Sequence, residues 1–190
     1  MRATAYLLLL SAVFLILTLV SGCDLDPPAI CERHTEPRPL VFADDWTATA
    51  AADDPLADHR PEPVICPSSA WGEEFGVFEV STGACNYLSV EQPLAEPIAV
   101  GDSLRVQIWW QSLIASEPAT GHLALLIDGQ PIWEIEVAIP GASDARSITF
   151  ASPIAAEPGA TVTFHLHNHG ANSWTLAELA LLDSGSACER

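Results

Sequence analysis

The sequence contains no lysine, and basic residues of any kind are scarce. Seven arginines stand against 25 acidic residues, which gives a formal net charge of −18 at pH 7. A protein that binds nucleic acid through the phosphates needs a basic surface, so this charge excludes nucleic acid as a partner. The same charge argues against electrostatic adhesion to anionic lipid.

Enzyme signatures are missing as well. The sequence has no GxSxG, HExxH, Walker or GxGxxG motif, and no calcium loop of the Dx[DN]x[DN]G type. We therefore expect a protein that is not an enzyme and carries no cofactor. Its 15 prolines and 11 glycines disfavour a helical bundle, whereas 49% hydrophobic residues is too many for a disordered chain.

Residues 7–20 form a mostly apolar run with the length of a signal-peptide core, shorter than a membrane span. The run ends in Leu19-Val20-Ser21-Gly22-Cys23, which resembles the lipobox of bacterial lipoproteins. This resemblance implies a signal peptide over residues 1–22 and acylation of Cys23, so that the lipid bilayer is a partner. We expect the protein in the bacterial cell envelope, facing the periplasm or the cell exterior. Asp24 leaves open which membrane holds it.

Four further cysteines follow the expected anchor: Cys31, Cys66, Cys85 and Cys188. An even number in an exported chain favours two disulfides, for which three connectivities exist. We expect Cys66–Cys85 to close a local loop and Cys31–Cys188 to link the two ends of the domain. Residues 23–40 are expected to form a lipidated, Pro-rich tether, residues 41–190 the folded domain, and residues 53–67 a long surface loop.

Short runs of alternating apolar and polar residues fill the folded part and predict β-strands. Leu104, Val106, Ile108 and Trp110 would share one face of such a strand, and Asp128-Gly129 favours a two-residue hairpin turn. The fold class is therefore all-β, an antiparallel β-sandwich or jelly roll of about eight strands. The last segment could be helical instead. The expected strands are residues 41–46, 75–80, 87–92, 104–110, 123–127, 133–139, 148–150, 162–166 and 174–182.

The C-terminal half resembles the galactose-binding-domain-like jelly rolls found in carbohydrate-binding modules. The residues that carry the resemblance are Val100-Gly101-Asp102-Ser103-Leu104, residues 127–134, residues 137–141 and residues 164–174. The resemblance implies a sandwich whose members bind sugars, bind proteins or have no known ligand. Fold carries over from such a likeness better than function does.

Two groups of aromatic and polar residues are candidates for binding a carbohydrate. Sugar sites use aromatic faces against the apolar side of the ring and nearby polar groups for the hydroxyls. Trp109 is expected to lie on the outer face of its strand, whereas Trp110 and Trp133 are expected in the core. The candidate ligand-binding residues are Arg105, Gln107 and Trp109 in one group, and Asn168, Asn172 and Trp174 in the other.

His165, His167 and His169 are spaced by two, so on a strand all three would point to one face. Neutral imidazole is a good ligand for Zn²⁺ and Cu²⁺, which makes these histidines candidate metal ligands. The alternative is a polar, solvated strand end followed by a turn. The sequence thus favours a lipid-anchored, non-enzymatic binding module for a glycan or an envelope protein. A metal-binding envelope protein and a structural lipoprotein without a small ligand remain open as alternatives.

Overall fold

The computed structural model describes residues 36–182. The predicted signal peptide, the acylation of Cys23 and the predicted Cys31–Cys188 disulfide lie outside these residues. Within them, no helix has the length and apolar character needed to cross a membrane.

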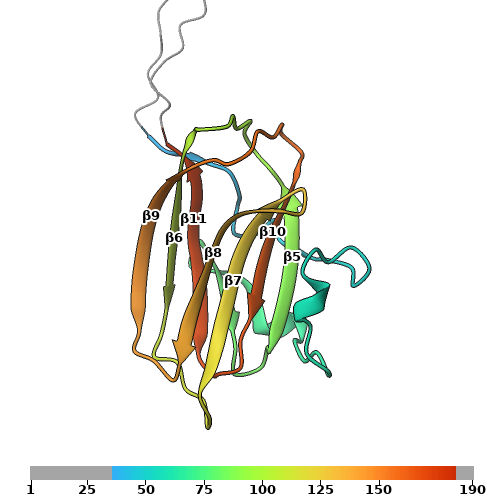
Figure 1. Ribbon diagram of the computed structural model, residues 1–190, viewed down its shortest axis with the longest axis vertical. Helices are drawn as coiled ribbons and strands as arrows, with labels where there is room; N and C mark the ends of the chain where they lie inside the picture. Colours follow the sequence, from blue (N-terminus) through green and yellow to red (C-terminus); the bar gives the residue numbers. More distant parts are fainter. Residues whose placement is uncertain (1–35, 183–190) are drawn as a thin grey trace, which may run out of the picture. The chain divides into compact units, whose positions relative to one another are not determined.

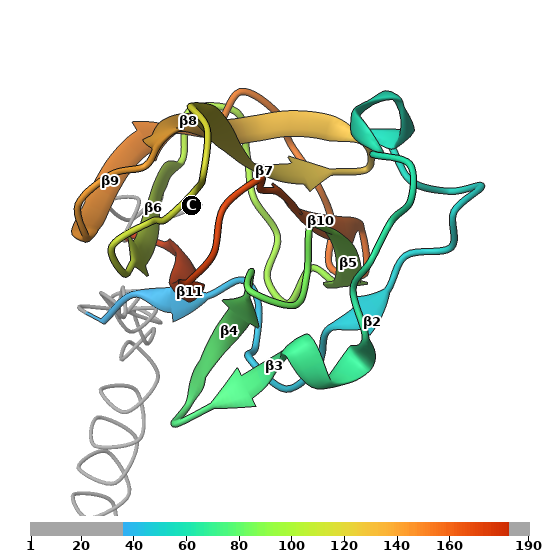
Figure 2. The same ribbon diagram turned by 90° about the horizontal axis from the view of Figure 1, so that it is seen from below.

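Two antiparallel sheets pack face to face (Figure 1). One has six strands, in which β1 (Arg38–Pro39) pairs with β11 beside the path β3-β4-β11-β6-β9. The other has five strands in the order β2-β5-β10-β7-β8. Figure 2 separates the two layers when the molecule is seen from below. The all-β sandwich expected from the sequence is confirmed. The remaining strands are β2 (Thr47–Ala48), β3 (Trp71–Glu74), β4 (Val77–Ser81), β5 (Tyr87–Pro93), β6 (Ser103–Trp110), β7 (Ala119–Ile127), β8 (Gln130–Ile139), β9 (Asp144–Ala151), β10 (Thr161–His167) and β11 (Ser173–Leu181).

The core lies between the sheets and is built by the alternation read from the sequence. On β6 the inward-facing residues Leu104, Val106, Ile108 and Trp110 are all at most 3% exposed. On β10, Phe164 is fully buried and meets Phe78 of the other sheet with ring centroids 5.4 Å apart. Each such side chain contributes about 1.5–3 kcal/mol when it leaves water. Asp128 and Gly129 form the β7–β8 turn with φ of 48° and 73°, as this residue pair favours.

The N-terminal part differs from the predictions in two places. Residues 41–46 are not a strand; the strand is β2, and Trp46 instead places its ring in the core 5.4 Å from that of Phe78. The folded part also begins before residue 41, because β1 pairs with β11 and Leu40 is fully buried. The two-residue strands β1 and β2, and the short edge strand β3, are too brief to leave a periodic pattern in the sequence.

The last segment is a strand and not a helix, and its misleading spacing has a structural cause. The register between β11 and β6 shifts between Leu176 and Glu178, which marks a β-bulge. An extra residue in one strand moves the following side chains to the other face. Leu176 and Leu179 therefore both point into the core although they are three residues apart, a spacing that otherwise indicates a helix.

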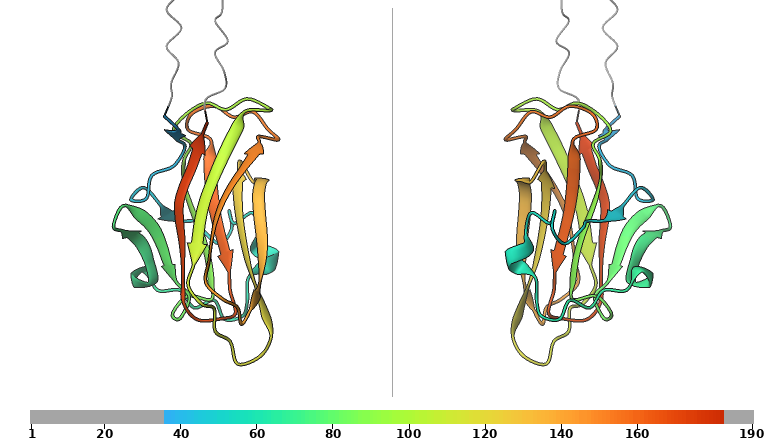
Figure 3. Two further views of the ribbon diagram at one scale, coloured as in Figure 1. Left: turned by 90° about the vertical axis from the view of Figure 1, so that its left-hand side faces the viewer. Right: turned by 90° about the vertical axis from the view of Figure 1, so that its right-hand side faces the viewer.

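Residues 49–67, here called the cover loop, run along the outside of the five-stranded sheet. They include residues 53–67, for which the sequence predicts a long surface loop. They include the short 3₁₀ turn η1 (Ala57–His59), and η2 (Ser68–Ala70) follows them. Figure 3 shows η1 on the side of the five-stranded sheet and β3 with β4 on the other. A disulfide joins Cys66 to Cys85, which confirms the predicted local pair and fixes the end of the cover loop beside the start of β5.

Candidate functional site

The outer surface of the six-stranded sheet, here called the open face, carries the first predicted ligand group. Alternation along β6 turns Arg105, Gln107 and Trp109 outward, because the residues between them fill the core. Trp109 is 38% exposed, whereas the other five tryptophans, which the described residues also include, are half-buried or buried. We define the open face by the outward residues Arg105, Gln107 and Trp109 of β6, Thr175 and Glu178 of β11, and Ser147 of β9.

Small side chains flank Trp109 on both neighbouring strands. Its register partners are Thr175 on β11 and Ala145 on β9. Two residues along the strand, Gln107 lies between Glu178 and Ser147. The indole is therefore surrounded by short residues, with an amide, a carboxylate and a hydroxyl within the next register positions. These are the groups that hydrogen-bond sugar hydroxyls.

Arg105 is held in place by an ion pair with Glu178. The guanidinium donates through Nε at 3.1 Å and through Nη2 at 2.9 Å to the two carboxylate oxygens. Both side chains are about a quarter exposed, so the pair contributes little to stability but fixes the geometry of both groups. The ion pair leaves carboxylate lone pairs and guanidinium N–H groups for a ligand.

The second predicted ligand group is not available to a sugar. Trp174 is fully buried, with its ring centroid 5.0 Å from that of Trp110 in the core. Asn168 is 1% exposed and donates to the carbonyl of Gly170. Asn172 adopts a φ of 137° in the loop before β11 and donates to the carbonyl of Ser112 at 2.7 Å. These asparagines hold the β10–β11 connection, and Trp174 faces inward because it pairs with the inward Trp110.

The outer surface of the five-stranded sheet, here called the histidine face, is covered rather than solvated. We define the histidine face by the outward residues Ser89 of β5, Thr163, His165 and His167 of β10, and His122 and Ala124 of β7. His165 and His167 share this face as predicted, but the expectation of a solvated strand end is wrong for His165, which is fully buried. The cover loop contributes to the burial through His59, whose ring lies 5.6 Å from that of His165. The rings of Tyr87 and His122 on the neighbouring strands lie 5.0 and 5.3 Å from it and complete the enclosure.

Asp54 fastens the cover loop to the sheet. Its side chain accepts hydrogen bonds from the Tyr87 hydroxyl at 2.5 Å and the Leu56 N–H at 3.0 Å, and it pairs with Arg60 at 3.1 Å. Burial raises the pKa of the Asp54 carboxyl, but the hydrogen bonds from Tyr87 and Leu56 outweigh it, so the pKa lies below its usual 3.8. Burial and the same carboxylate raise the pKa of Tyr87. Asp54 is therefore a charged anchor for the loop.

The predicted metal group is only partly assembled. In the described part of the chain, His165 comes together with His59 and His122, whose ligand atoms all lie within 4.8 Å of one another. His167 and His169 are not part of that group, although their rings lie 4.4 Å apart. Sequence reasoning missed His59 and His122. His59 lies in a loop without periodicity, and His122 faces His167 only through the pairing of β7 with β10.

Comparisons with known proteins find solved structures that are similar in architecture but low in sequence identity. No family model and no curated protein matches the chain. Among solved structures it is similar to one described as CBM4, with 12% identity, a TM-score of 0.43, and coverage of 73% of this chain and 96% of that one. It is also similar to the Agl-KA catalytic domain (11% identity, TM-score 0.41), covering 83% of this chain but 30% of that one. The complex of TmCBM61 with β-1,4-galactotriose has 11% identity and a TM-score of 0.33, over 66% of this chain and 79% of that one.

Proposed function

We propose that this protein is a lipid-anchored envelope protein whose sandwich domain binds a carbohydrate on the open face. The observation that carries the proposal is the exposure of Trp109 near one end of β6, on a sheet face lined by small and hydrogen-bonding side chains. Tryptophan is among the residues most enriched at the energetic centres of binding sites, where its large aromatic surface serves as an anchor.

The chemistry of the open face suits a neutral sugar. The apolar face of a pyranose ring stacks on an indole, and its hydroxyls need both donors and acceptors nearby. Gln107 supplies both, the Arg105–Glu178 pair supplies a fixed donor and a fixed acceptor, and Ser147 adds a hydroxyl. With a net charge of −18, an anionic glycan would be repelled at long range, so a neutral one is favoured.

The carbohydrate proposal is tested by measuring affinity for neutral oligosaccharides of glucose, galactose, mannose and xylose with the full-length protein in detergent. We expect Trp109→Ala to weaken binding by about tenfold or more, because truncating a central aromatic anchor costs about 2 kcal/mol or more. Phe75→Ala is the matched control, since Phe75 is 95% exposed but lies in the turn between β3 and β4. Failure of every sugar to bind, or equal losses in both variants, would overturn the proposal.

The membrane anchor in this proposal rests on the lipobox resemblance at Cys23. Two or more acyl chains are needed for stable attachment, because a single chain binds membranes only weakly. Replacing Cys23 with serine should therefore release the protein from the detergent-soluble membrane fraction into the soluble fraction. A variant that stays with the membrane would exclude anchoring through Cys23, while the glycan experiment would still decide the ligand.

A further inference from the structure

His165 is buried without any of the partners that a buried imidazole requires. It is fully buried, and neither its Nδ1 nor its Nε2 has a hydrogen-bond partner among the described residues. Nδ1 of His122 is likewise buried and unpaired. Buried polar atoms are nearly always paired, so a group left in this state needs an explanation, and an ion in the site is one.

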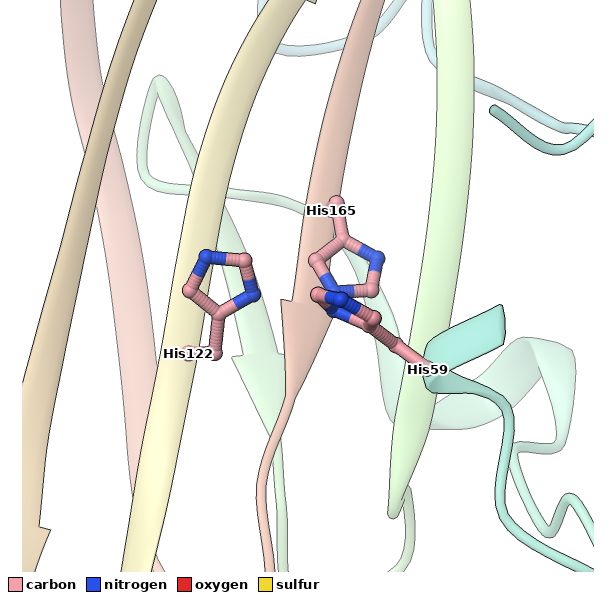
Figure 4. A group of neighbouring side chains, drawn as sticks. All are labelled: His59, His122 and His165. Carbon is pink, nitrogen blue, oxygen red and sulfur yellow. The ribbon is translucent and has the colours of Figure 1, made fainter. Parts of the chain in front are cut away.

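Three imidazole rings from three separate segments converge at this point (Figure 4). His59 comes from η1 of the cover loop, His122 from β7 and His165 from β10. Their ring centroids lie 5.1 Å (His59–His122), 5.3 Å (His122–His165) and 5.6 Å (His59–His165) apart. The group is therefore a nearly equilateral triangle and not a row along one strand.

This triangle has the size that a tetrahedral metal ion requires. An imidazole nitrogen binds Zn²⁺ at about 2.0–2.1 Å, which places the centroids of three tetrahedral ligands roughly 5 Å apart. The candidate ligand atoms lie within 4.8 Å of one another, so modest rotations of the rings would bring them to bonding distance. His59 is exposed and gives the ion a route from solvent.

The charge state and the surroundings also suit a metal. Metal ligands must be neutral imidazoles, and the complete burial of His165 disfavours a charged imidazolium there. The Nε2 of His122 lies 3.3 Å from a carboxylate oxygen of Glu134. A carboxylate on the far nitrogen of a histidine is the usual support for a metal ligand, and it leaves Nδ1 for the ion.

We propose that His59, His122 and His165 form a binding site for one divalent transition-metal ion, Zn²⁺ or Cu²⁺, with a fourth position left for water. No fourth histidine, cysteine or acidic residue in the described part of the chain belongs to the group. The order of affinities for such ligands places Cu²⁺ above Zn²⁺. The bound ion would join the cover loop to β7 and β10, opposite the open face.

The test is a titration of the full-length protein with Zn²⁺ alone, in competition with a chromophoric chelator. The key variant is His59→Ala, because His59 is exposed and its loss leaves the core intact. Supporting residues typically change metal affinity by about 10–100-fold, so loss of a direct ligand should weaken Zn²⁺ binding by at least that factor. His169→Ala is the matched control, being an exposed histidine outside the triangle, and its affinity should stay within about twofold of the wild type.

Each other outcome contradicts the site. If the wild type does not bind Zn²⁺, or if His59→Ala binds Zn²⁺ with the wild-type affinity, the proposed site is wrong. Loss in His167→Ala and His169→Ala with retention in His59→Ala would assign the metal to the strand end instead. A second readout is the visible spectrum with Co²⁺ in place of Zn²⁺: tetrahedral coordination gives intense absorption bands, and these should disappear in His59→Ala and persist in His169→Ala.

Discussion

The open face and the histidine face are built by the same rule but meet water differently. In both sheets alternate residues point away from the core, and in both the outward row mixes polar and apolar residues. On the open face Arg105 and Gln107 are half-buried and Trp109 is exposed, although the neighbouring Thr175 is only 1% exposed. On the histidine face the cover loop lies over the row, so that His165 is fully buried. The comparison teaches that alternation decides which side chains point outward, whereas distant segments decide whether they reach solvent.

Burial changes the chemistry of similar polar groups. The Arg105–Glu178 pair on the open face is partly solvated and contributes little to stability. Under the cover loop, Asp54 must be held by Tyr87, Arg60 and the Leu56 N–H, and His165 is neutral near pH 7. One surface is therefore suited to a ligand that arrives from solution, and the other to a small ion.

The largest predicted effect separates the two tryptophans that the sequence proposed as sugar ligands. Trp174→Ala should lower the free energy of unfolding by about 3–5 kcal/mol, because it leaves a cavity beside Trp110 in the core. Trp109→Ala should lower it by about 1 kcal/mol or less, since the indole is already 38% exposed and leaves no enclosed cavity. Urea denaturation measures both. Equal losses in the two variants would contradict the assignment of one ring to the core and the other to the open face.

A smaller but still large effect is expected where the cover loop is anchored. Asp54→Ala should destabilise the protein by about 2–4 kcal/mol, since it leaves the Leu56 N–H without its acceptor and Arg60 without its counter-charge. The Tyr87 hydroxyl loses the carboxylate but can still donate to the Leu56 carbonyl at 3.0 Å. The cover loop should also become sensitive to proteolysis. Asp58→Asn is the control, because Asp58 is exposed in the same loop. A cover loop that stays resistant in Asp54→Ala would show that the Cys66–Cys85 disulfide suffices to hold it.

The histidine face should also make stability depend on pH in the metal-free protein. Burial lowers the pKa of His165 to about 3 in the folded protein from its ordinary value of 6.5, so between these pH values the unfolded chain binds more protons. Stability then rises with pH: this contribution is complete above pH 6.5 and is lost as the pH falls toward 3. Between pH 6.5 and 5 we expect a loss of about 1–2 kcal/mol, measured by urea denaturation in the presence of a chelator.

His167 also makes the free energy of unfolding rise with pH, because burial and the nearby His169 lower the pKa of His167 to about 4. The lowered pKa of Asp54 acts only further down, as the pH falls through and below its usual 3.8. His169→Gln should leave most of this dependence of the free energy of unfolding on pH unchanged. Stability that stays constant from pH 7 to pH 5 would contradict the burial of neutral imidazoles under the cover loop.

The sequence predicts the orientation of those side chains that follow from the alternation of inward and outward residues along a strand. It places Trp109 outward and Leu104 inward correctly, because both follow from the period of β6. It misplaces Trp174, whose burial follows from its register against the inward Trp110. It also misses His59, since the path of the cover loop is fixed by Asp54 and Tyr87 through a contact 33 residues apart in the chain. Contacts of this kind leave no local signal.

The most direct test of the division between the two faces measures both ligands on both key variants of the full-length protein. Oligosaccharide affinity and Zn²⁺ affinity are determined for the wild type, Trp109→Ala and His59→Ala. We predict that Trp109→Ala loses oligosaccharide binding and keeps Zn²⁺ binding, and that His59→Ala does the reverse. A variant that loses both ligands, or loses the one assigned to the opposite face, would contradict the account.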